Sequence, residues 1–170
     1  MDSDITGKWF TGKRETMALN SSAILDAVAT HAMSLGHFQS VTLHEPRAVT
    51  GNGIAACVLV ESITPIRSSG AAMTSVRLEL MVGIYTTTLT DADTDSIDAV
   101  LGEAADALME TYTEDFTLGG LVRQVDIFGA YGQALGARAG NYIRPDGSPP
   151  LRVFRVTLPL IVDDVFAQAA

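Results

Sequence analysis

The sequence contains little cysteine, little lysine and few aromatic residues. Cys57 is its only cysteine, which excludes an intrachain disulfide and a cysteine-based zinc site, and in its strand-like context it is expected to be a small buried apolar residue. Lys8 and Lys13 are the only lysines, so every later basic residue is an arginine. The formal charge of −9 disfavours sequence-specific binding of nucleic acid, because such binding needs a basic stripe that displaces counterions.

Long apolar runs are also missing. The longest stretches without charge are interrupted by Gly, Thr or Pro before they reach about 18 residues, the length that suggests a membrane span. Met1–Phe10 has no positive region followed by an apolar one, so no secretion signal is evident. Hydrophobic residues nevertheless make up 47% of the chain and charged residues only 18%, so we expect some apolar surface to contact partners.

The length of 170 residues suits one domain. Met1–Thr16 is polar apart from Trp9 and Phe10 and shows no hydrophobic period. We therefore expect residues 1–16 to form a flexible N-terminal extension and residues 17–170 to form a single domain.

The clearest strand pattern lies in Ser75–Thr88, where every second residue from Val76 to Ile84 is apolar. This alternation predicts a half-buried strand against which the core is built. Helical spacing before it predicts a helix over residues 21–35, capped by Asn20 or Ser21. Strands are expected over residues 40–44 and 54–63, and the loop Thr64–Ala72 would close a long antiparallel hairpin.

The firmest helix pattern follows, with apolar residues at spacings of three and four from Ile97 to Tyr112. Two further strands are predicted, Leu121–Phe128 and Leu151–Val162, separated by the Gly-rich stretch Gly129–Pro150. The resulting order, α-β-β-β-α-β-β, predicts an α+β fold: a mixed, largely antiparallel sheet with two helices packed on one face.

Two stretches imitate ligand-binding loops. Asp91–Ser96 has carboxylates at alternate positions, as a calcium loop does, but Ser96 stands where such a loop needs Gly and Gly102 where it needs a bidentate Glu. We predict that this cluster caps the following helix. The glycines of residues 129–140 include no G-x-G, so they do not form a dinucleotide-binding fingerprint.

Catalytic residues are not evident. His31, His37 and His44 are spread over a helix, a loop and a short strand, with no obvious Ser or Cys nucleophile beside them. We predict that the protein is not an enzyme and has no catalytic, cofactor-binding or metal-binding residues.

The second helix carries an acidic ridge, which we define as Glu103, Asp106 and Glu110, and no basic residue lies between Asp91 and Asp115. Like charges at these spacings cost about 0.2–0.5 kcal/mol per pair on an isolated helix. The ridge is consistent with a plain solvent-exposed face, with a surface that meets arginines of a neighbouring subunit, or with a channel lining that repels DNA phosphates.

The last third of the chain supports a more specific interpretation. VDIFGAYGQALGARAGNYIR (Val125–Arg144), followed by LRVFRVTLPLIV (Leu151–Val162), resembles the tail terminator proteins of long-tailed bacteriophages. The resemblance extends over about Met17–Val162 in element order and length, and its residue-level specificity lies in this last third. The extension Met1–Thr16 departs from the compact pattern of that family.

The resemblance implies a structural virion protein. Members of that family form a ring, typically a hexamer, at the head-proximal end of the tail tube, where they terminate tail polymerisation and provide a head-tail joining surface. The implied partners are copies of the same chain, the tail tube protein and a head-completion or connector protein, and DNA would pass through the ring without sequence-specific binding. The implied location is the virion tail, after assembly in the host cytoplasm, with no membrane association and no cofactor.

The resemblance implies that Gly129–Pro150 and Thr64–Ala72 are candidate inter-subunit or inter-ring arms. We expect Gly129–Pro150 to serve assembly rather than folding, because a connection of this length inside a compact domain is commonly functional. The candidate inter-subunit contacts are Arg67, Tyr131, Arg138, Tyr142, Arg144, Glu103, Asp106 and Glu110.

Two alternatives remain at this stage. One is another ring-forming virion module, either a head-completion or connector protein or a tail tube subunit, and a tube subunit would form long polymers by itself. The other is a small-molecule-binding or enzymatic domain, which would require a pocket with convergent polar groups.

Overall fold

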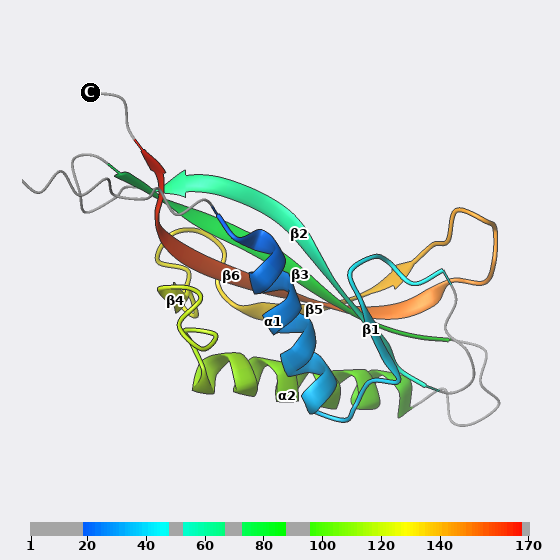
Figure 1. The fold of residues 1–170 in the computed structure, drawn as a ribbon. Helices are drawn as coiled ribbons and strands as arrows, with labels where there is room; N and C mark the ends of the chain where they lie inside the picture. The colour runs from blue at the N-terminus through cyan, green and yellow to red at the C-terminus, as the bar shows by residue number, and fades with distance from the viewer. Residues whose placement is uncertain (1–18, 48–52, 67–72, 88–95, 168–170) are drawn as a thin grey trace, which may run out of the picture.

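The computed structural model describes residues 19–47, 53–66, 73–87 and 96–167. Two helices and a six-stranded mixed sheet make up this part of the chain, which confirms the predicted α+β class (Figure 1). The elements are α1 (Ser21–Ser34), β1 (Ser40–Thr42), β2 (Ala55–Ile66), β3 (Met73–Thr87), α2 (Ile97–Glu114), β4 (Gln124–Val125), β5 (Gly136–Tyr142) and β6 (Leu151–Ala167). The predicted extension, residues 1–16, lies outside the described residues.

The sheet is built around its two long strands, β3 and β6. The strand order is β1-β2-β3-β6-β4, and β5 also pairs with β6. One edge of β6 therefore carries β3, while the other carries β5 opposite Leu151–Thr157 and β4 opposite residues 160–161. Every pairing is antiparallel except that of β1 with β2, as the predicted mixed and largely antiparallel sheet requires.

Helix α1 begins and ends where its sequence predicts. The Asn20 side chain accepts a hydrogen bond from the Ala23 N–H at 3.2 Å and thereby satisfies one of the free donors of the first turn. Ile24, Val28 and Ala32 are buried at spacings of four residues, so one face of the helix packs on the sheet.

Helix α2 buries the stripe that its periodicity predicts, namely Leu101, Ala104, Ala105, Leu108 and Tyr112. Its first residue, Ile97, follows Ser96, and residues 91–95 of the expected acidic cap lie outside the described part of the chain. At the other end, the Asp115 carboxylate accepts a hydrogen bond from the Gly119 N–H at 2.9 Å, and the chain turns toward β4.

Both helices cover the same face of the sheet (Figure 1), which we call the helix face. The residues of β3 that point to it are Val76, Leu78, Leu80, Val82 and Ile84, and each is fully buried, as predicted. Val156, Leu158 and Leu160 of β6 lie beside them in the same core. Each such side chain contributes about 1.5–3 kcal/mol by leaving water, so this face supplies most of the apolar stabilisation.

The prediction that β3 is only half buried is wrong. Arg77, Glu79 and Tyr85 point to the other face, yet they are only 7%, 9% and 0% exposed. The Arg77 guanidinium forms an ion pair with Glu79 and donates a hydrogen bond to the Gln133 carbonyl oxygen at 2.9 Å. The loop between β4 and β5 therefore covers this part of β3, and a local alternation of apolar and polar residues cannot report a loop that packs back from far along the chain.

Two boundaries in the last third also differ from the prediction. The expected strand Leu121–Phe128 is reduced to Gln124–Val125, because the Asp126 carboxylate accepts hydrogen bonds from the N–H groups of Ala130 and Tyr131 at 2.7 and 2.8 Å and turns the chain. The Gly-rich stretch Gly129–Pro150 is not wholly a loop, because it contains β5. Gly and Ala have low strand propensity, so β5 depends on its pairing with β6 rather than on its own residues.

Candidate assembly surface

The face of the sheet away from the helices, which we call the open face, bears a small second cluster at its β1 end. Cys57, Tyr85, Leu151 and Val153 are buried there, with Leu59 and Tyr142 packed at the margin. The Tyr142 ring meets the Tyr85 ring edge-on, with 5.5 Å between centroids, a favourable geometry for two aromatic rings. The cluster fixes Tyr142 to the sheet and so anchors the C-terminal end of β5.

Tyr85 can lie flat on the open face because residue 83 is a glycine. A Cβ atom at Gly83 would lie 2.5 Å from Cε2 of Tyr85, closer than the two atoms can approach. The ring brings its hydroxyl to 3.7 Å from the Cys57 sulfur, whose S–H donates to it. Burial raises the pKa of the Cys57 thiol above its ordinary value, and burial likewise raises the pKa of Tyr85. Cys57 is thus a neutral, buried residue, as its sequence context predicts.

Next to this cluster the open face carries two arginines from adjacent strands. Arg138 of β5 is directly opposite Arg155 of β6, and both side chains are exposed. They line a groove of about 340 Å³ whose walls include Glu61 and Met81. Among the described residues, neither guanidinium has an ion-pair or hydrogen-bond partner. The sheet therefore presents two positive side chains without an ion-pair partner at this point, and Glu61 is the one carboxylate that lines the same groove.

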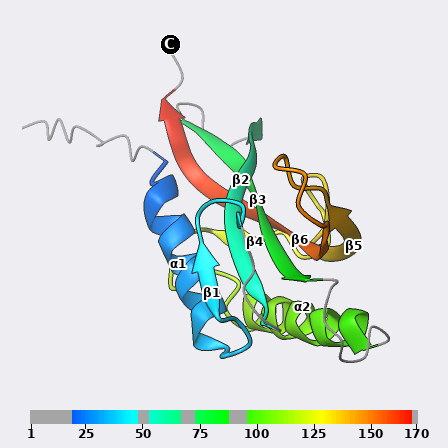
Figure 2. The ribbon, with the colours of Figure 1, turned by 90° about the vertical axis from the view of Figure 1, so that its right-hand side faces the viewer.

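The arm that joins β5 to β6, residues 143–150, extends beyond the sheet on the side away from α1 (Figure 2). Arg144 fixes its shape, since its guanidinium donates hydrogen bonds to the Pro149 carbonyl oxygen at 3.1 and 2.8 Å and to the Arg47 carbonyl oxygen at 3.4 Å. Asp146 accepts a hydrogen bond from the Ser148 N–H, which lowers the pKa of its carboxyl group. Ile143 stands 81% exposed at the start of this arm.

The loop between β4 and β5 presents a second apolar side chain, Phe128, which is 91% exposed. The loop is held in place by contacts with Arg123, which precedes β4. Arg123 donates to the Tyr131 hydroxyl at 3.0 Å, lies over the Tyr131 ring at 5.5 Å, and forms an ion pair of 2.9 Å with Asp163. Phe128 is therefore presented by a loop whose conformation is already defined.

The acidic ridge lies on the solvent side of α2. Glu103, Asp106 and Glu110 are all exposed, and no described residue forms an ion pair with them. The nearby Asp98 differs, because both of its oxygens accept hydrogen bonds from Arg152 of β6, at 2.7 and 2.8 Å. These bonds lower the pKa of Asp98 and join the first turn of α2 to the sheet.

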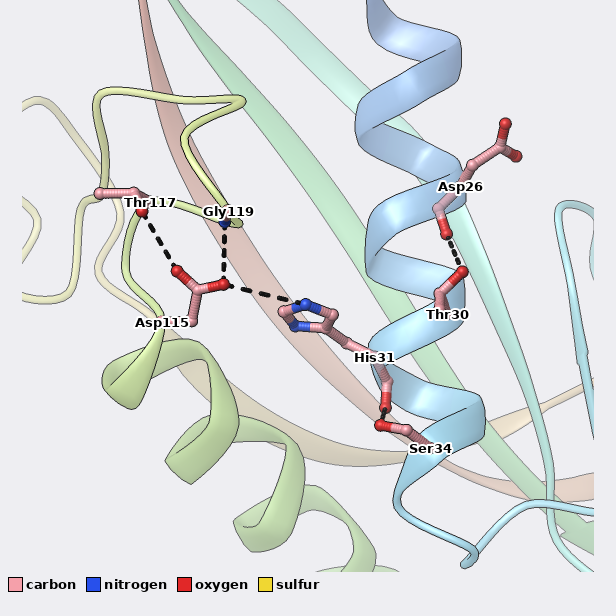
Figure 3. Close-up of polar contacts among 7 residues, drawn as sticks. All are labelled: Asp26, Thr30, His31, Ser34, Asp115, Thr117 and Gly119. Atoms are coloured by element: carbon pink, nitrogen blue, oxygen red, sulfur yellow. Dashed lines mark hydrogen bonds and ion pairs between the residues drawn. The ribbon is translucent and has the colours of Figure 1, made fainter.

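A polar contact also joins the two helices (Figure 3). The Nε2 atom of His31 in α1 lies 3.9 Å from an oxygen of Asp115, the residue that caps α2. The His31 ring also stacks on Tyr112 of α2. Asp115 also accepts hydrogen bonds from the Thr117 hydroxyl at 3.1 Å and from the Gly119 N–H. His31 thus packs between the two helices, beside the Asp115 carboxylate.

The structure distributes the predicted contact residues over both sides of the sheet. Arg138, Tyr142 and Tyr131 lie toward the open face, Arg144 lies in the arm, and the acidic ridge lies on α2. Arg67 lies outside the described residues. Tyr131, Tyr142 and Arg144 also have partners within the chain, so part of their role is to shape the loops that carry them.

Sequence reasoning missed two features of this surface. Arg155 lies in the predicted strand Leu151–Val162 but is not among the predicted contacts, and the pattern alone could not show its exposure, since Arg77 in the equally apolar β3 is buried. Phe128 falls within the predicted strand Leu121–Phe128, whereas the bonds from Ala130 and Tyr131 to Asp126 turn the chain around it and leave it exposed.

Comparison with known proteins adds no family assignment. No family model matches the chain, and no curated protein matches it. In the part of the chain that the structure describes, no group of three or more His, Cys, Asp or Glu side chains is placed to hold a metal ion. None of the described helices has both the length and the apolar character needed to span a bilayer.

Proposed function

We propose that this protein is a structural subunit of a phage tail, which forms a ring at the head-proximal end of the tail tube, stops tail polymerisation and offers the surface to which the head is joined. The proposal takes the phage context from the resemblance of Val125–Arg144 and Leu151–Val162 to tail terminator proteins. The alternatives of the same class are a connector or head-completion protein and a tail tube subunit.

One observation carries the assembly role: the last third of the chain presents two large apolar side chains, Phe128 and Ile143, on loops with defined shapes. They are 91% and 81% exposed, although each loop is fixed by hydrogen bonds of Asp126 or Arg144. An isolated exposed apolar residue needs no explanation. A preorganised loop that presents one is different, because its ordering cost is met before binding and its apolar contact then contributes to affinity.

The open face supports the same proposal. No described helix covers it, and it carries the half-buried Tyr142 and the exposed, unpaired Arg138 and Arg155, residue types that are enriched at protein interfaces. The exposed Phe128 and Ile143 lie in the two segments that flank β5, so both are close in sequence to this strand of the sheet.

The test is the growth of tail tubes in vitro. Purified tube protein polymerises alone or with this protein, and tube lengths are measured by negative-stain microscopy. We expect shorter tubes, each with the added protein at one end only. Tubes of unchanged length with no added density would overturn the terminator function, and long polymers formed by this protein alone would identify a tube subunit instead.

A further inference from the structure

The positions of Arg138 and Arg155 are electrostatically unfavourable within one chain. They face each other across β5 and β6 on the open face. Side chains at such positions have Cβ atoms about 4.5–5.5 Å apart, and like charges there are destabilising. No described residue forms an ion pair with either. An anion from outside the chain would remove this repulsion.

The groove around the pair is open to a partner. On the same face of β5, Arg138 is flanked by Gly136 and Gly140, so no side chain stands beside it along its strand. The remaining lining is mostly small or polar, and Glu61 is its one acidic residue. A broad element such as a helix can therefore approach both guanidinium groups.

The chain itself carries a matching set of anions. Glu103, Asp106 and Glu110 are exposed on α2 at spacings of three and four residues, which places neighbouring Cβ atoms about 5–6 Å apart. The spacing between neighbouring carboxylate residues of the acidic ridge is thus nearly the same as the spacing between the two arginines. The two sets cannot meet within one chain, because α2 packs on the helix face while Arg138 and Arg155 point away from it.

We propose that the arginine pair of one copy binds the acidic ridge of the next copy. The inference rests on the proposed ring and names the contact that sets the order of its subunits. Such a contact joins two different surfaces, so it is head-to-tail, and a head-to-tail contact generates a ring when its rotation closes. Complementary charges of this kind determine register and partner choice more than total affinity.

The test uses two charge-reversed variants. Arg138→Glu with Arg155→Glu makes the open face acidic, and Glu103→Arg with Asp106→Arg makes the ridge basic. Each variant alone opposes like charges at every contact, so each is expected to sediment as a monomer under conditions in which the wild type assembles. The two variants change net charge in opposite directions, so a general effect of net charge cannot explain the same loss in both.

Mixing the two variants is the decisive step. An acidic open face then meets a basic ridge, and the unmodified arginine pair meets the unmodified acidic ridge, so every alternating contact is again complementary. We expect the mixture to recover the mass of the wild-type assembly, as should a single chain with all four substitutions. Circular dichroism checks that each variant is folded, and the neutral pair Arg138→Gln with Arg155→Gln replaces a reversal that fails to fold.

The outcomes separate this inference from the proposed function. A wild type that assembles while both variants also assemble would overturn the arginine contact and leave the ring proposal standing. Variants that stay monomeric even when mixed would show that the two surfaces do not meet each other. A wild-type chain that never assembles would overturn both proposals.

Discussion

The two faces of the sheet are built on different principles. The helix face is mainly apolar, and its side chains from β3, β6 and both helices form one buried core. The open face instead holds a buried ion pair, a small aromatic cluster and two unpaired arginines. Folding is therefore driven mainly from one face, and the other is free to carry the surface that meets partners.

Removing a core side chain from the helix face should have the largest effect. Leu80→Ala and Leu108→Ala come from β3 and α2 but belong to one core, and each should lower the free energy of unfolding by about 2–5 kcal/mol. Urea denaturation measures the effect, with Glu110→Ala on the exposed side of α2 as the control. Equal losses of unfolding free energy for Glu110→Ala and Leu108→Ala would contradict the assignment of Leu108 to the buried side of α2.

Breaking the ion pair between Arg77 and Glu79 on the open face should have the next largest effect on stability. A half-buried β3 would leave Glu79 in solvent and make its replacement nearly neutral, but in the structure Glu79 is buried against Arg77. Glu79→Ala leaves the Arg77 charge without its partner and should cost about 3 kcal/mol. Replacing both residues by Met should recover much of this loss in the same denaturation experiment, and a double variant as unstable as Glu79→Ala would argue against the pair as the cause.

Shortening the arm should affect assembly far more than stability. Tyr142 and Leu151 close the β5–β6 pairing, so an Asn-Gly turn in place of residues 143–150 can join the two strands directly. We expect a change of less than about 1 kcal/mol in unfolding free energy, since the arm contributes nothing to the core, together with loss of the oligomer. Denaturation and light scattering measure the two effects on one sample, and an intact oligomer would remove the arm from the interface.

The smallest effect should be the pH dependence of the bond between α2 and β6. Arg152 lowers the pKa of Asp98 from its ordinary value of 3.8, so the bond stabilises the fold above that value and is lost as the pH falls through the lowered pKa. The Asp98→Asn variant should thus be less stable than the wild type at neutral pH, and the difference should shrink in acid. A difference that persists at the lowest pH would point to a cause other than ionisation.

The helices and long strands could be predicted because their signals are local. The Asn20 cap and the stripe from Leu101 to Tyr112 specify α1 and α2, and the alternation of β3 specifies its core side. Local signals could not predict that the β3 side chains on the open face are buried, nor that β5 exists. Both depend on partners distant in sequence, namely Gln133 for Arg77 and β6 for a strand of glycine and alanine.

The surface was predicted less completely for the same reason. Arg138 could be proposed from its setting in a Gly-rich stretch, but the register that places it opposite Arg155 is a property of the folded sheet. Exposure of Phe128 likewise follows from the side chain of Asp126, whose hydrogen bonds turn the chain.

The central claim is that this chain assembles with itself into a closed ring. Its most direct test is the mass of the purified protein in solution, measured by sedimentation over a range of concentrations. The account predicts one discrete species at a small multiple of the 18.0 kDa chain, the hexamer being the expected case, with no growth beyond it. A monomer at every concentration, or a polymer that lengthens without limit, would contradict it.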